Sequence, residues 1–123
     1  MAQHAVTAPI LPGKLEAWKD FLRELGGPRC REFEASRRDV GLRERVYLQE
    51  TPQGAFAIVT WEGAEPQKAM QIFGRQTGPF ADWFRAKIKD LHGIDLASVT
   101  DPPSKLLLDV GSARPSVPAE QRV

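Results

Sequence analysis

One stretch decides how this chain folds: residues 43–62, with the sequence RERVYLQETPQGAFAIVTWE. Residues 45–51 and 55–61 are interpreted as two strands. Thr51-Pro52-Gln53-Gly54 lies between them, and this is the chemistry of a tight turn, because proline presets φ at the second position and glycine closes the turn. The stretch therefore predicts a β-hairpin in the middle of the chain.

The sequence on both sides of the hairpin has helical periodicity, and two more candidate strands lie outside these helical parts. Residues 5–11 are interpreted as the first strand. Residues 14–40 and 66–92 carry apolar side chains at helical spacing, each with one internal break at glycine. Residues 105–110, KLLLDV, are expected to form the last strand.

The resulting order is strand, helix, strand, strand, helix, strand. It predicts an α+β, ferredoxin-like βαββαβ fold, with a four-stranded antiparallel sheet and the helices on one face. Residues 1–110 are expected to form this single domain. Residues 111–123, rich in proline, serine and charge, are expected to form a flexible C-terminal tail.

Composition narrows the class of protein. The chain has 123 residues, of which 41% are hydrophobic and 27% charged, as in ordinary globular domains. A net charge of +1 gives no field that would attract nucleic acid or an acidic membrane. No apolar run is long enough for a membrane helix, and residues 1–7 lack the layout of a signal peptide. With Cys30 as the single cysteine, a cytoplasmic protein is expected.

Both faces of the predicted sheet carry apolar side chains. Val46 and Leu48 alternate with Tyr47 on one strand of the hairpin, and the other strand is apolar on both sides. A sheet with one face in water should alternate more cleanly. Helices on one face leave the other open, so we expect a homodimer in which two sheets pack face to face as a barrel. At roughly 25 cal/mol per Å², a few hundred Å² would contribute several kcal/mol to association.

The chain resembles the dimeric α/β barrel superfamily, which includes antibiotic-biosynthesis monooxygenases and small stress-response proteins. This likeness covers residues 5–110 and is mainly topological. Shorter stretches resemble a group of small bacterial proteins of unassigned function. These stretches are Ser36-Arg37-Arg38, Gly41-Leu42, Leu48-Gln49, Thr51–Gly54, Pro79-Phe80, Trp83-Phe84 and His92–Leu96.

Two basic residues are candidate catalytic groups. His92 ends a predicted helix, where the helix dipole would favour the imidazolium and raise its pKa, so it is a candidate general acid or base. Its alternative role is to cap the helix by bonding free carbonyls. Arg37 and Lys87 each fall within an apolar helical arc, where a buried cation requires a partner or an anionic ligand. The alternative is that each extends its charge into water.

Aromatic residues are candidates for a small-molecule pocket between helices and sheet. The set predicted to hold a hydrophobic or aromatic ligand comprises Tyr47, Trp61, Trp83 and Phe80. The alternative is that these rings are simply core, which is more typical of Trp83 on its helical stripe.

The resemblance implies that, if the protein is an enzyme, it is a cofactor-independent oxygenase or isomerase acting on an aromatic or polyketide-like substrate. His92 and Arg37 would then stabilise negative charge as the substrate loses a proton. A non-catalytic ligand-binding or interaction protein is the main alternative. A haem-binding barrel is a minor one, because Trp83 and His92 lie nine residues apart on nearly opposite helix faces. No nucleotide or metal motif is present in the sequence, so no cofactor is expected.

Overall fold

The computed structural model describes residues 2–99 and 104–111 of the chain. Its elements follow in the order β1 (Ala2–Pro9), α1 (Leu15–Gly26), α2 (Cys30–Asp39), β2 (Leu42–Thr51), β3 (Gly54–Gly63), α3 (Pro66–Arg75), α4 (Pro79–His92) and a short 3₁₀ helix, η1 (Leu96–Ser98). The predicted hairpin is confirmed, because β2 pairs with β3 in antiparallel register and Thr51 lies opposite Gly54.

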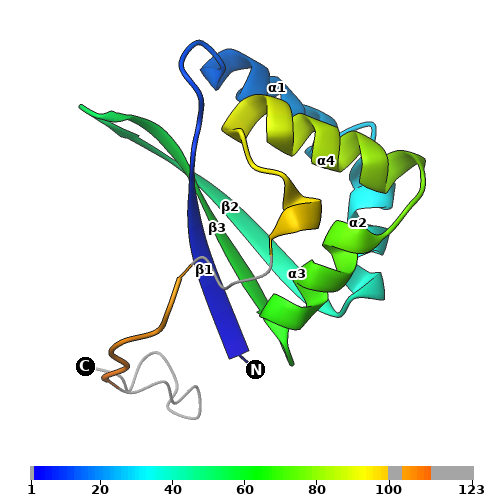
Figure 1. Cartoon of the computed structure of the whole chain (residues 1–123), viewed down its shortest axis with the longest axis vertical. Coiled ribbons are helices and arrows are strands. Elements are labelled where there is room, and N and C mark those ends of the chain that lie inside the picture. Colours follow the sequence, from blue (N-terminus) through cyan, green and yellow to red (C-terminus); the bar gives the residue numbers. More distant parts are fainter. Residues whose placement is uncertain (1, 100–103, 112–123) are drawn as a thin grey trace, which may run out of the picture.

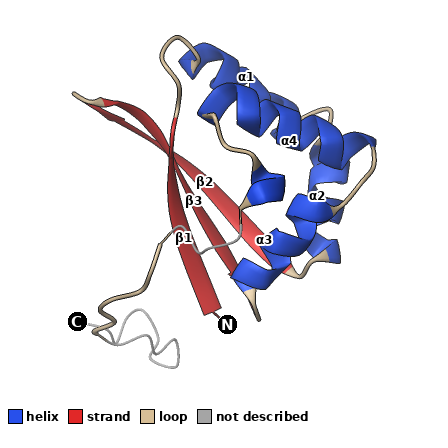
Figure 2. Cartoon of the chain, viewed as in Figure 1, coloured by secondary structure: helices blue, strands red, loops and turns tan. Residues whose placement is uncertain are grey.

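The molecule has two layers, a sheet and a group of helices that all lie on one of its faces (Figure 1). The sheet is antiparallel with the strand order β1-β3-β2, so β1 and β2 are its edges. Figure 2 shows the opposite face of this sheet without helical cover. None of the helices in the described residues is long and apolar enough to cross a membrane.

The predicted four-stranded ferredoxin-like sheet is wrong, because the sheet formed by the described residues has three strands. Residues 105–110, the expected last strand, have no regular structure, and Leu107 within them is 90% exposed. A run of three leucines at residues 106–108 indicates a tendency to be buried, but it does not reveal whether a strand with a free edge is within reach. Each predicted crossover contains two helices, α1 with α2 and α3 with α4, and they are separated where the sequence shows its glycine breaks. Of the expected tail, residues 112–123 lie outside the described residues.

The helix boundaries follow the sequence signals. Both α3 and α4 begin with proline, whose fixed φ suits the first helical turn and whose missing N–H would have no partner there. The chain leaves α4 through Gly93, which adopts the left-handed conformation at φ 73° and donates its N–H to the Lys89 carbonyl. This ending, which the sequence predicted, turns residues 94–99 back over the sheet.

The core lies between the helices and the inner face of the sheet. Its rings are tilted or edge-on to one another: Phe84 is 5.3 Å from Phe73 and 5.5 Å from Phe21, measured between ring centroids. The sheet contributes Ala57, which is 1% exposed and small enough for the rings to approach the strand. The buried apolar residues of this cluster are Ile10, Trp18, Phe21, Leu25, Ala57, Phe73, Ala81, Phe84 and Leu91.

The strand register decides which side chains face this core. Val6, Val59 and Val46 lie opposite one another in one row across the three strands. Since side chains alternate along a strand, residues at the neighbouring positions face the uncovered side. There Tyr47 lies opposite Ile58, and Tyr47 is 53% exposed.

Candidate functional site

A cavity of about 160 Å³ lies between the inner face of the sheet, helices α3 and α4, and residues 94–99. Its wall is mainly apolar. The apolar part includes Val6, Ala8, Val59, Met70, Ile88 and Leu96, and the polar part Arg37, Glu44, Trp61, Gln67, Gln71 and His92. An apolar cleft with a few polar groups is the usual form of a small-molecule site.

Arg37 and Glu44 form a buried ion pair in this wall. The Arg37 Nε donates to Glu44 Oε1 over 2.7 Å, and the two side chains are 6% and 7% exposed. Trp61 donates its Nε1–H to the same carboxylate oxygen over 3.0 Å. The chain reverses between α2 and β2 at Gly41, whose φ is 71°, and this reversal brings the two charged residues together. Arg37 therefore does not extend into solvent.

The Arg37 guanidinium lies among aromatic rings. Its Cζ is 4.4 Å from the centroid of Phe73, 4.8 Å from that of Phe33 and 4.9 Å from that of Phe84. Its Nη1 donates to the Ser36 hydroxyl over 3.3 Å. These contacts hold the guanidinium plane in place, because ring faces attract a cation and a buried side chain loses its rotameric freedom.

One nitrogen of this guanidinium makes no hydrogen bond within the described residues. The Arg37 Nη2 is buried and has no hydrogen-bond partner among the described residues. A buried donor without a partner forfeits about 1–3 kcal/mol, more for a charged group. Arg37 also lines the cavity, and an acceptor brought into contact with Nη2 would recover this loss.

His92 borders the same cavity from the end of α4. Its Nδ1 lies 2.7 Å from the carbonyl oxygen of Pro9, at the end of β1. A carbonyl only accepts, so Nδ1 carries a hydrogen in this bond and, in the neutral ring, Nε2 keeps its lone pair. Burial lowers the pKa of His92, and the bond to Pro9 opposes this in part. The expected rise in the pKa of His92 is thus wrong, because the loss of water on burial outweighs the bond to Pro9.

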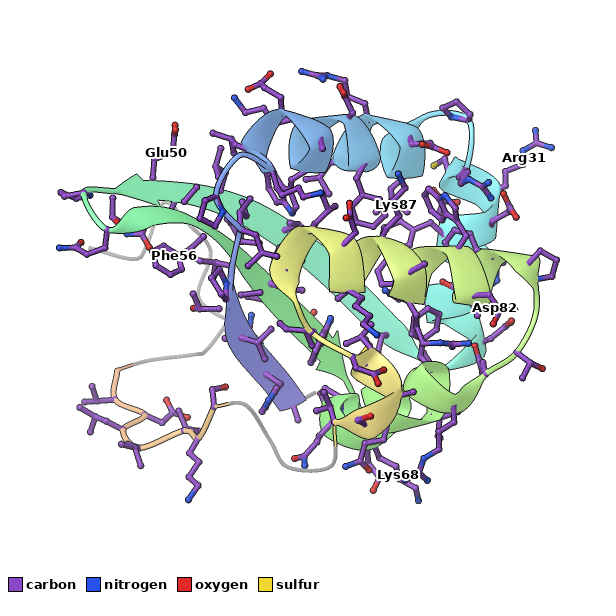
Figure 3. All side chains as sticks on the ribbon, turned by 45° about the horizontal axis from the view of Figure 1, so that its top comes forward. Arg31, Glu50, Phe56, Lys68, Asp82 and Lys87 are labelled. Carbon is purple, nitrogen blue, oxygen red and sulfur yellow. The ribbon has the colours of Figure 1, made fainter. Side chains whose placement is uncertain are left out.

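The structure brings three of the six predicted site residues to one cavity: Arg37, His92 and Trp61. Tyr47 does not line it, because strand alternation places its ring on the uncovered face of the sheet, where it is 53% exposed. Lys87, labelled in Figure 3, is half-buried on α4 and does not line it either.

Phe80 and Trp83 also lie away from the cavity, in an aromatic cluster that joins α4 to α1 and α2. Their ring centroids are 5.8 Å apart, and the Arg29 guanidinium lies 4.1 Å from the Trp83 ring. Trp83 is thus placed with the packing residues, as its position on the helical stripe indicated, and away from His92.

Glu44 is the site residue that the sequence interpretation missed. It occupies the same side of β2 as Leu42 and Val46, which face the core. A carboxylate at an inward position of a strand was the available signal, because burying one requires a charged partner. His4, also unconsidered, stacks on Trp61 at 5.9 Å between ring centroids, and its Nε2 is buried without a partner in the described residues.

Comparison with known proteins assigns this chain to no family. The described residues contain no group of three or more histidine, cysteine, aspartate or glutamate side chains that could hold a metal ion. No family model, curated protein or solved structure matches the chain at a significant level. The function has therefore to be inferred from the cavity.

Proposed function

We propose that this protein binds a small aromatic molecule that carries one neutral hydrogen-bond acceptor, such as a ketone. The observation that carries the proposal is the Arg37 Nη2, a buried donor without a partner in the described residues, on a side chain that lines a mainly apolar cavity. The ring of the ligand would contact the apolar wall, and its acceptor would take the free donor.

The volume of the cavity limits the size of the ligand. An engineered apolar cavity of about 150 Å³ in another protein holds benzene, so the 160 Å³ here suits one ring with a short substituent. Ile88 and Met70, on facing helices, form part of the apolar wall. Methionine adapts its shape to irregular ligands, which fits a wall that contacts a ring.

The charges of the site favour a neutral acceptor over an anion. The carboxylate of Glu44 already balances Arg37, and the lowered pKa of His92 keeps that ring uncharged at neutral pH. A carboxylate ligand would lose its hydration without gaining an unpaired cation. A ketone loses less on leaving water and still accepts from Nη2.

Two probe molecules of similar shape test this proposal. Acetophenone has a carbonyl acceptor, whereas isopropylbenzene has none, and their dissociation constants are measured by calorimetry or by ligand-observed NMR. A net gain of about 1–1.5 kcal/mol from the hydrogen bond corresponds to roughly a 5- to 10-fold preference for acetophenone. The double variant Arg37→Met/Glu44→Leu removes the donor without leaving a lone charge. In this variant the preference for acetophenone over isopropylbenzene should fall by the same roughly 5- to 10-fold, which is about the whole of it.

Tyr47→Ala is the matched control for these measurements, because this side chain lies on the uncovered face and should leave both affinities unchanged. An equal ratio of affinities in the parent protein and the double variant would disprove the role of Arg37. Failure of both probes to bind the parent protein would contradict the site itself.

His92 supports a second candidate function, cofactor-independent catalysis. His92, whose Nε2 keeps its lone pair, and Arg37 line the same cavity. With a ketone oxygen on Nη2, His92 would take a proton from the adjacent carbon, and the C–H electron pair would form the C=C bond of an enolate whose oxygen Arg37 stabilises.

Proton exchange distinguishes this enzyme from a passive carrier. In D₂O, the parent protein should accelerate deuterium incorporation into the methyl group of acetophenone, followed by ¹H NMR, and His92→Gln should reduce the rate to that of buffer. A protein that binds acetophenone but leaves the exchange rate unchanged would be a carrier, the alternative class.

A further inference from the structure

The segment that follows Ser104 carries an unusual amount of exposed apolar surface. Leu106, Leu107, Leu108 and Val110 are 79%, 90%, 77% and 82% exposed. Figure 3 shows the side chains of this segment standing clear of the layers of the molecule. A single exposed leucine is ordinary, but four large apolar residues within six positions indicate a surface that binds something.

The outer edge of β1 is a site where a further strand can pair. The Ile10 N–H bonds to the Ala55 carbonyl, on the side of β3. Because the N–H and C=O of one residue point to the same side of an antiparallel strand and the sides alternate, Gln3, Ala5 and Thr7 direct theirs to the open edge. Within the described residues, the Ser104 hydroxyl donates to the Ala5 carbonyl at this edge, and the Pro9 carbonyl at the end of the strand is bonded to His92 Nδ1.

We propose that residues 105–110 of one copy of this chain add as a strand to the β1 edge of a second copy, and that the exchange is reciprocal. The strand pattern of the segment fits this position. Leu106, Leu108 and Val110 share one side of it, and Lys105, Leu107 and Asp109 share the other. The purely apolar side would face the helices, where Val6 and Ala8 of β1 line the cavity.

The contact between Ser104 and Ala5 limits how the chain's own segment could pair at this edge. Ser104 lies at Ala5, so an antiparallel strand from that point passes the end of β1 at Ala2 after three residues. A parallel strand from the same point reaches Pro9, which has no N–H to donate. Figure 1 shows the segment running away from β1 instead. A second copy is not tied to the contact at Ser104, so its segment can pair in antiparallel direction along residues 2–8, short of Pro9.

The proposed strand does not depend on the identity of the ligand, but it would complete the site. Val6, Thr7 and Ala8 of the edge strand are part of the cavity wall, so a strand beside them would extend that wall. It would also pair exposed backbone groups of an edge, which otherwise invite aggregation.

Sedimentation and hydrogen exchange of the full chain test the proposal. At about 50 µM the parent protein should sediment as a dimer, and the amides of Gln3, Ala5 and Thr7 should exchange at least roughly 10-fold more slowly than in dilute solution, where monomer dominates. Leu106→Asp/Leu108→Asp should be a folded monomer, checked by circular dichroism, with fast exchange at all three amides.

Leu107→Asp is the matched control, because its side chain lies on the mixed side of the segment and the variant should remain a dimer. Three results would overturn the proposal: a parent protein that stays monomeric, a dimer in which these amides exchange freely, and equal loss of the dimer in both variants. Slow exchange in a monomer would show that the segment pairs within its own chain, which also overturns it.

Discussion

At the scale of single residues, the Arg37–Glu44 pair is the most consequential feature of the molecule. Two charges that are nearly without solvent lie among aromatic rings. Replacing such a pair with apolar residues is often neutral, whereas removing one partner leaves a buried charge. The pair therefore contributes little net stability, and its value lies in holding a guanidinium donor at a defined place in the cavity wall.

The free energy of unfolding should fall more when one partner of the pair is removed than when both are replaced by apolar residues. Arg37→Met is expected to lower the free energy of unfolding by about 3–5 kcal/mol, because Glu44 is left buried without its partner. Arg37→Met/Glu44→Leu should be no less stable than that single variant. Urea denaturation measures all of these values. Additive losses in the double variant would show that the pair is not coupled.

The pH dependence of stability should show the lowered pKa of His92. Its pKa in the folded protein lies below the ordinary value of 6.5, so the unfolded chain binds more protons between the two values. Stability therefore falls as the pH is lowered through about 6.5, and becomes independent of this group below its folded pKa. The difference in unfolding free energy between the parent protein and His92→Gln should follow this course from pH 8 to pH 5. A difference that stays constant would contradict the lowered pKa.

At the scale of elements, the contact between α3 and η1 sets one wall of the cavity. A Cβ built at Gly74 of α3 would lie 2.7 Å from the Leu96 carbonyl oxygen, which is closer than real contacts allow. Leu96 also lines the cavity. The absence of a side chain at Gly74 thus lets η1 pack directly on α3, which brings residues 94–99 over the sheet.

Gly74→Ala should therefore destabilise the protein, although alanine is the better helix former. Overpacking of this kind costs about 1–3 kcal/mol, more than the helix propensity gained. Gly26→Ala at the end of α1 is the control, because a Cβ there meets no atom within 4 Å, and it should be neutral or slightly stabilising. Thermal or urea unfolding measures both. A stabilised Gly74→Ala would show that η1 moves away without loss.

At the scale of the whole molecule, a one-sided helical layer leaves the other sheet face uncovered (Figure 2), and the sheet has two edge strands, β1 and β2. The uncovered face carries Tyr47 and Ile58 in one row, and the β1 edge is open. Homodimerisation stays a prediction for this chain, and the exposed leucines now direct it to the edge of β1. The ferredoxin-like four-stranded sheet is not formed by the chain itself.

Ligand binding should stabilise the whole fold. Acetophenone at 100 times its dissociation constant should add about 2.7 kcal/mol to the free energy of unfolding. For a chain of 123 residues, this corresponds to a rise of roughly 10 °C in melting temperature. Differential scanning calorimetry checks this value, with Arg37→Met/Glu44→Leu as the variant in which the rise per unit concentration of acetophenone should be smaller. No rise in the parent protein would contradict the site.

The sequence by itself determined the local structure of this protein. The turn at Thr51–Gly54, the proline starts of α3 and α4 and the glycine after α4 depend on neighbouring residues, so their signals are readable along the chain. Arg37 and His92 were also recognisable, since polar groups within or at the end of an apolar helical arc need a special environment.

Only the tertiary structure decided what those residues contact. Arg37 pairs with Glu44, and His92 bonds to Pro9, so each contact joins residues from two separate elements. Residues 105–110 form no strand, because they pair with none of the three strands of the sheet. Periodicity shows which side chains avoid water, but not which partner buries them. For that reason Tyr47 and Trp61, equally aromatic in the sequence, lie on opposite faces of one sheet.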